Sequence, residues 1–229
     1  RELVLSGVLG AGMVYSAFIM AWTVPGVIRR FVADEGLSGA LMPAVRNAET
    51  ENLEEAKRLA SQALGALILV CILLSIGGIL SAPYLIRYIV APDFKGVQFD
   101  LTVSLSQVLF PFVLFVSVLT WIETLVNLRE HYFWPKIAPA MVSICIVAAA
   151  LLLRNDDPIN TIWAVAYASI VGGALQVVVC IPSLKRLWGI IPPSFSGFTS
   201  PRFINLLSEM GKVALIGIAA KINLIVLRN

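Results

Sequence analysis

The chain has 229 residues, of which 59% are hydrophobic and 14% are charged, and its formal net charge is +3. Soluble globular domains carry about 25% charged residues, so this composition excludes an ordinary soluble domain and predicts an integral membrane protein. The alternating pattern of a membrane β-barrel is absent, so we predict an all-α integral membrane protein, a multi-helix transmembrane bundle. The slight positive charge gives no reason to expect a nucleic-acid partner.

Apolar runs of about 20 residues, the length that spans a bilayer as a helix, predict six or seven helices. The first is a truncated piece over 1–9, and the second starts near residue 14 and runs towards a basic pair at 29–30. The third rises from the polar segment 47–58 and continues to 90, and the fourth covers 101–128 with an interruption at Pro111. The fifth and sixth cover 137–153 and 159–181, and a seventh begins near 203.

Loop charges predict the orientation of these helices. If the loop around 46–58 is cytoplasmic, alternation places eight basic residues on that side: Arg46, Lys57, Arg58, Arg129, Lys136, Lys185, Arg186 and Arg202. The opposite loops hold three, Arg87, Lys95 and Arg154. The positive-inside rule therefore favours this assignment.

The sequence offers no catalytic constellation. Its three cysteines lie far apart in apolar runs without metal-ligand spacing, and its one histidine, His131, lies beside an aromatic cluster typical of a headgroup belt. The sequence has no glycine-rich loop followed by a Lys-Ser/Thr pair, so we do not expect ATP hydrolysis by this chain. We therefore predict no catalytic residue, no metal and no cofactor, and a transporter driven by a coupling ion or by the membrane potential.

The sharpest signal is the segment 24–45, VPGVIRRFVADEGLSGALMPAV, which sets Arg29, Arg30, Asp34 and Glu35 between apolar stretches. An ionisable side chain in a membrane helix costs about 2.5 to 3.5 kcal/mol on insertion scales, so it usually faces a water-filled cavity or a ligand. Arginine grips phosphate oxygens with a planar fork of donors. The alternative is that the basic pair only anchors a helix end at the interface.

This segment resembles the hallmark of the MurJ (MviN) family of lipid II flippases, in which Pro-x-x-x-Arg-Arg precedes an acidic-Gly-small-Ser element and a Pro. Further similar elements occur in the family's order along nearly the whole chain, both before and after this segment. They are Arg1-Glu2, Gly10-Ala11-Gly12-Met13, Ala91-Pro92-Asp93-Phe94, Phe110-Pro111-Phe112, Pro135-Lys136-Ile137-Ala138-Pro139, Trp163-Ala164-Val165, Gly172-Gly173-Ala174-Leu175-Gln176 and Pro182-Ser183-Leu184-Lys185.

The resemblance implies a member of the multidrug/oligosaccharidyl-lipid/polysaccharide exporter superfamily, with fourteen helices in two lobes around a central cavity. Residues 1–190 would form the amino-terminal transmembrane lobe, helices 1 to 6 with the first truncated, and 191–229 a linker and the start of helix 7. It implies alternating access in the bacterial cytoplasmic (inner) membrane. The implied partners are lipid II, an undecaprenyl-diphosphate-linked disaccharide peptide, together with membrane lipids and the cell-wall synthesis machinery.

Two groups of charged residues are the predicted site. We predict that a cationic cavity binds the diphosphate through Arg1, Arg29, Arg30 and Lys221, and that gating or ion-pair roles fall to Glu2, Asp34, Glu35 and Glu123. The resemblance supports Arg1, the basic pair and Asp34. Lys221 and Glu123 rest on their positions in apolar helices. A snorkelled or ion-paired lysine at 221 and an interfacial glutamate at 123 are the alternatives.

Other functions stay open on the sequence. Within the superfamily, the chain could belong to a flippase for another lipid-linked oligosaccharide, or to a drug/cation antiporter, which would need an acidic cavity. A structural membrane subunit would have no cationic pocket. A membrane-embedded polymerase or transferase would need an acidic catalytic residue, for which Asp93 and Asp157 are weak candidates.

Overall fold

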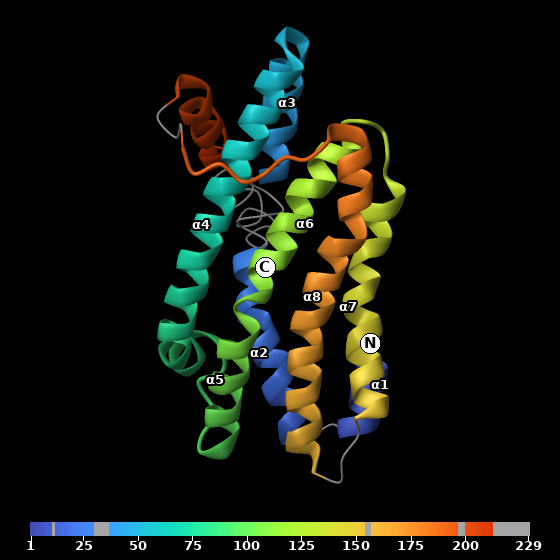
Figure 1. Cartoon of the computed structure of the whole chain (residues 1–229). Helices are drawn as coiled ribbons and strands as arrows, with labels where there is room; N and C mark the ends of the chain where they lie inside the picture. Colours follow the sequence, from blue (N-terminus) through green and yellow to red (C-terminus); the bar gives the residue numbers. More distant parts are fainter. Residues whose placement is uncertain (11, 30–36, 154–156, 197–199, 213–229) are drawn as a thin grey trace, which may run out of the picture.

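A computed structural model (Figure 1) describes residues 1–10, 12–29, 37–153, 157–196 and 200–212. These residues form helices joined by short connections, without a strand. The helices are α1 Glu2–Leu9, α2 Met13–Arg29, α3 Ser38–Glu51, α4 Leu53–Leu85, the π-helical turn η2 Ile86–Val90, α5 Val97–Leu109, α6 Phe112–Asn127, α7 Phe133–Leu152 and α8 Pro158–Trp188. A further helix covers 201–212. The predicted all-α class is confirmed.

Four stretches of the described chain are long and apolar enough to cross a membrane: Leu53–Val90, Val97–Asn127, Phe133–Leu152 and Pro158–Trp188. Their outward faces carry large exposed apolar side chains, such as Leu73 and Leu80 on α4. Such surfaces are stable against lipid tails, while helices satisfy their own backbone hydrogen bonds. The chain is therefore a multi-pass membrane protein.

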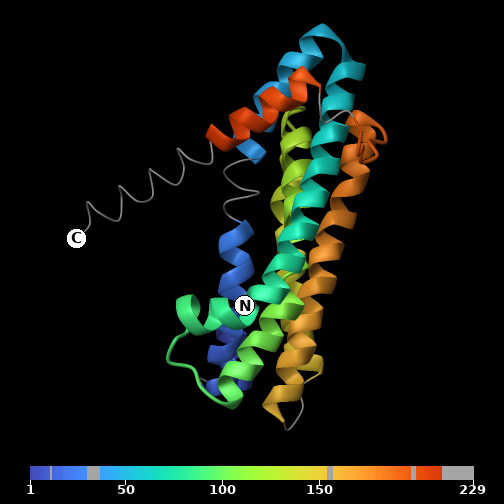
Figure 2. The ribbon, with the colours of Figure 1, turned by 90° about the vertical axis from the view of Figure 1, so that its left-hand side faces the viewer.

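The long helices lie side by side as a bundle, with α8 packed along both α7 and α6 (Figure 1). Figure 2 shows α2 beside this bundle, with its upper end level with the middle of α4 and α8. Glycine permits the closest of these helix contacts. A Cβ atom added at Gly172 of α8 would lie 2.7 Å from the Cα atom of Val142 of α7, so the two backbones touch only because no side chain stands between them.

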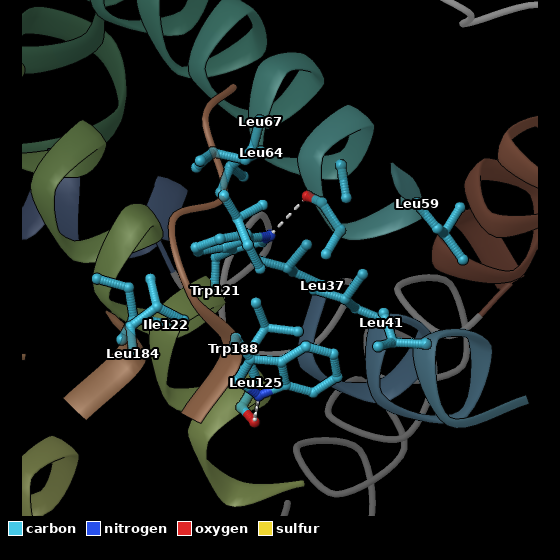
Figure 3. Close-up of a cluster of buried hydrophobic side chains, with 14 of the residues drawn as sticks. Leu37, Leu41, Leu59, Leu64, Leu67, Trp121, Ile122, Leu125, Leu184 and Trp188 are labelled. Carbon is cyan, nitrogen blue, oxygen red and sulfur yellow. Dashed lines mark hydrogen bonds between the residues drawn. The ribbon is translucent and has the colours of Figure 1, made fainter. Parts of the chain in front are cut away.

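An apolar core joins α3, α4, α6 and the end of α8 (Figure 3). Two buried tryptophans anchor it: Trp121 donates from Nε1 to the Ala60 carbonyl at 3.1 Å, and Trp188 donates from Nε1 to the Leu125 carbonyl at 2.8 Å. Helix 201–212 adds Phe203 to the same core. These indole hydrogen bonds satisfy the polar atom that a buried tryptophan brings with it.

The chain that follows α8 lies across α4. The Ser194 amide donates to the Ser61 carbonyl at 3.0 Å, and the Ser61 hydroxyl donates to the Pro192 carbonyl. Gly65, one turn further along α4, leaves the space that this crossing needs, since an added Cβ atom would lie 2.0 Å from the Ser194 oxygen. The segment 189–196 is thereby fixed to the bundle.

The helix boundaries differ from the sequence prediction at one place in particular. The predicted third helix corresponds to α4 and η2, which start at Leu53 within 47–58 and end at Val90, but the prediction missed the separate helix α3, which ends at Glu51. Asn52 has an extended backbone and its side chain accepts a hydrogen bond from the Glu54 amide at 3.0 Å, so it caps a new helix. The interruption at Pro111 is confirmed, and α8 continues past its predicted end through Pro182.

The eight basic residues assigned to one side do lie at one end of the bundle. The end of α3, the start of α4, the α6–α7 connection and the end of α8 all meet at the upper end of Figure 1. Ion pairs join them: Arg129 pairs with Glu49, and Arg202 pairs with Glu51 at 2.6 Å and Glu55 at 3.6 Å. Arg87 and Lys95 lie by the opposite ends of α4 and α5, while Arg154 lies outside the described residues.

Candidate functional site

A cavity of about 530 Å³ lies between α2, α6, α7, α8 and the residue that precedes α1. Its wall on α2 runs from Trp22 to Val27, the last turns of that helix. Because α2 ends level with the middle of the long helices, this wall lies within the depth of the bundle and not at its end (Figure 2). The position matches that expected for charges that face an internal cavity.

Arg1 brings a cation to this cavity. Its guanidinium carbon lies 4.9 Å from the ring centroid of Trp22, whose indole in turn lies 4.9 Å from the ring of Phe112. A guanidinium has five N–H donors, and a cation–π contact uses none of them. The carboxylate of Glu2 is 3.8 Å away, beyond hydrogen-bond distance, and the Arg1 side chain is 26% exposed. Arg1 can therefore still donate to an anion in the cavity.

Glu123 brings the negative charge of the described cavity wall. It projects from α6, and its Oε1 accepts a hydrogen bond from Nζ of Lys136 in the first turn of α7 at 2.9 Å. The carboxylate is therefore already paired, whereas among the described residues Arg1 has the 3.8 Å contact to Glu2 and the cation–π contact with Trp22. The structure thus places Glu123 in an ion pair, and its gating role stays a prediction. The described part of the cavity wall thus holds one cation, Arg1, and one carboxylate that is already paired.

Neutral polar groups complete the cavity wall. Thr23 donates to the Ile19 carbonyl at 2.9 Å and Thr120 to the Val116 carbonyl at 3.1 Å, so both hydroxyls keep acceptor lone pairs. Gln176 of α8 is buried, and its amide nitrogen has no hydrogen-bond partner among the described residues. Trp22, Thr120 and Gln176 were assigned no role from the sequence, although Gln176 belongs to one of the family-like elements.

The structure describes only some of the remaining predicted site residues. Arg29 is the last residue of α2, following the cavity-lining Gly26 and Val27, and the structure describes its place on the helix. Arg30, Asp34, Glu35 and Lys221 lie outside the described residues. Within the described ranges, no group of three His, Cys, Asp or Glu residues is arranged to hold a metal ion.

These features define a class: a multi-pass α-helical membrane protein with a partly cationic cavity inside its bundle. The sequence profile described as lipid II flippase MurJ matches residues 5–229, and the chain belongs to the MurJ family. The family resemblance predicted from the sequence motifs is confirmed.

Individual relatives agree with this assignment. A probable lipid II flippase MurJ from Rhizobium tropici is 29% identical over 231 residues, covering 99% of this chain and 43% of the relative. The lipid II flippase MurJ of Burkholderia cenocepacia is 27% identical over 190 residues, covering 82% of this chain and 36% of that protein. The chain thus spans less than half the length of the curated relatives it matches.

A solved structure shares the fold. The structure titled lipid II flippase MurJ, inward closed conformation, superposes with a TM-score of 0.73 at 18% identity, covering 94% of this chain and 44% of the other. The likeness shows that the helices are arranged as in one half of that protein.

Proposed function

We propose that this chain forms the amino-terminal lobe of a flippase that carries lipid II across the bacterial cytoplasmic membrane by alternating access. The observation that carries the proposal is Arg1, a cation whose side chain has no hydrogen-bond partner among the described residues and lies in a cavity within the depth of a bundle that belongs to the MurJ family. We expect the chain to act in transport, as the flippase family to which it belongs does.

Electrostatic capture explains how the cavity works. The diphosphate of lipid II meets Arg1, and its undecaprenyl tail stays in lipid along the apolar outer faces of the long helices. A cavity of 530 Å³ falls in the range of about 300 to 1,000 Å³ that is usual for ligand pockets. We expect the other predicted binding residues, Arg29, Arg30 and Lys221, to add further positive charge to the headgroup site of the full-length protein.

The same charges argue against the antiporter alternative. A carrier of cationic drugs needs an unpaired acid in its cavity. The acid of the described cavity wall, Glu123, is neutralised by Lys136 at 2.9 Å, and Arg1 would repel a cation. A flippase for another lipid-linked oligosaccharide uses the same phosphate chemistry and is separated from lipid II by experiment.

The energy for the cycle comes from a coupling ion or from the membrane potential. Moving one elementary charge across 100 mV provides about 2.3 kcal/mol, so arginines that change depth as the lobes rock would couple the potential to transport. The gating roles proposed for Glu2, Asp34, Glu35 and Glu123 belong to this step, in which ion pairs exchange between the lobes.

Complementation tests the proposal. The full-length protein is expressed in a bacterium depleted of its own lipid II flippase, as wild type and as Arg1→Gln, Arg1→Lys, Arg29→Ala and Arg29→Lys, at equal membrane levels. We expect rescue by the wild type and loss of rescue by Arg1→Gln and Arg29→Ala. Arg87→Gln, in η2 and not among the residues that line the cavity, is the matched control and should rescue. Failure of the wild type to rescue would contradict lipid II as the substrate.

A further inference from the structure

Gln176 is an unexplained polar group in the wall of the cavity. Gln176 is only 2% exposed, and its Nε2 atom has no hydrogen-bond partner in the part of the chain that the structure describes. Most buried side-chain polar atoms in folded proteins have a hydrogen-bond partner, so a buried atom without one needs an explanation. Because this side chain lines the cavity, a bound molecule is the partner that the arrangement can accept.

Helix packing keeps this amide at the cavity wall. One turn before Gln176, Gly172 lies against the backbone of Val142, and Gly173 leaves 2.9 Å between an added Cβ atom and the ring of Phe112. These two close approaches bring α8 against α7 and α6 at the level of the cavity. The amide thus lies at a closely packed junction of three helices, where its burial keeps it from bulk water.

The surroundings of Gln176 differ from those of Arg1. Arg1 belongs to the α1–α2 side of the cavity, where it contacts Trp22. The α6–α8 side offers the amide donors of Gln176, the acceptor oxygen of Thr120 and the hydroxyl of Ser143 on α7. Neutral donors and acceptors suit hydroxyl and amide groups, which a bare diphosphate lacks. The cavity therefore has a cationic side and a hydrogen-bonding side, on which the Glu123 carboxylate is paired with Lys136.

We propose that Gln176 is a specificity-determining residue that donates from Nε2 to an uncharged oxygen, a hydroxyl or an amide carbonyl, in the sugar part of the lipid-linked headgroup. This inference rests on the proposed function and deepens it, since it separates recognition of the sugars from capture of the diphosphate. No covalent step is involved. The phosphate side of the ligand would be left to Arg1.

Binding measurements with two lipids test this assignment. Purified full-length protein in detergent is titrated with lipid II and, separately, with undecaprenyl diphosphate, which has no sugar. Gln176→Met removes the amide at nearly constant length, and Gln107→Met is the matched control. Gln107 is a part-buried glutamine of α5 that donates to the Ile79 carbonyl at 3.1 Å and does not line the cavity.

The expected result is a selective loss. A neutral hydrogen bond left unmade on binding corresponds to about a tenfold weaker Kd, or about 1.4 kcal/mol, for lipid II in Gln176→Met. The affinity of the same variant for undecaprenyl diphosphate and both affinities of Gln107→Met should equal those of the wild type. If Gln176→Met does not fold, the neutral variant Gln176→Leu removes the same donor and should show the same selective loss for lipid II.

Two results would overturn the inference while leaving the proposed function standing. One is wild-type affinity of Gln176→Met for lipid II, and the other is an equal loss for both lipids, which would place Gln176 at the diphosphate or in the fold. A wild-type protein that binds neither lipid would contradict the proposed function itself, and the inference with it.

Discussion

The contact between α7 and α8 gives the most direct quantitative prediction. In Gly172→Ala, the new Cβ atom would lie 2.7 Å from the Cα atom of Val142, where ordinary contacts begin at 3.4 Å. The clashing atom belongs to the backbone, so no side-chain rotation relieves the clash and the two helices must separate by about 0.7 Å. Overpacking of this kind costs about 1 to 3 kcal/mol.

A matched substitution isolates this cost. Gly77 of α4 faces open space, with nothing within 4 Å of an added Cβ atom, so Gly77→Ala carries only the helix-propensity gain of about 1 kcal/mol. Gly172→Ala gains the same propensity, and the difference in unfolding free energy between the two variants should therefore be about 1 to 3 kcal/mol. Titration of the purified protein with sodium dodecyl sulfate in mixed micelles measures it. Equal stability of the two variants would refute the close approach of α7 and α8.

Three further variants test the rest of the bundle. Trp121→Phe removes the indole donor to α4 and should lower the unfolding free energy by about 1 to 2 kcal/mol in the same titration, and an unchanged midpoint would contradict the hydrogen bond. Gly65→Ala forces a Cβ atom to 2.0 Å from the Ser194 oxygen, so limited proteolysis should cleave the segment 189–196 faster than in the wild type. Arg202→Gln breaks an exposed ion pair with Glu51, so any loss should stay below about 1 kcal/mol and vanish at high salt, and a loss that persists in salt would argue for a different role.

Hydropathy and helix breakers predict most of the fold because each membrane span must be apolar over its whole length. The boundary between α3 and α4 escaped this reasoning, since both sides of Asn52 are polar helix-forming sequence. The signal that could have found it is an asparagine followed by Glu54 and Glu55, which is typical of a helix start. The predicted end of the sixth helix at 181 is too early, because α8 continues through Pro182 to Trp188.

The site was predictable in its charges and not in its neutral groups. The family resemblance predicted Arg1, and the position of Glu123 in an apolar helix predicted Glu123; the structure brings both to one cavity. Gln176 carries no charge, and its isolation depends on how closely α6, α7 and α8 pack at Gly172 and Gly173. Only a three-dimensional arrangement can show that an amide is buried without a partner.

Crosslinking can test whether the headgroup of lipid II binds inside the cavity that contains Arg1. A photoreactive amino acid replaces Thr120, which lines the cavity, or Leu73, which is 60% exposed on the outer face of α4, in the full-length protein in cells whose lipid II carries a labelled peptide. We expect a labelled crosslink at Thr120 that is lost in Arg1→Gln, and no labelled crosslink at Leu73. Equal labelling at the two positions, or labelling at Thr120 that persists in Arg1→Gln, would contradict it.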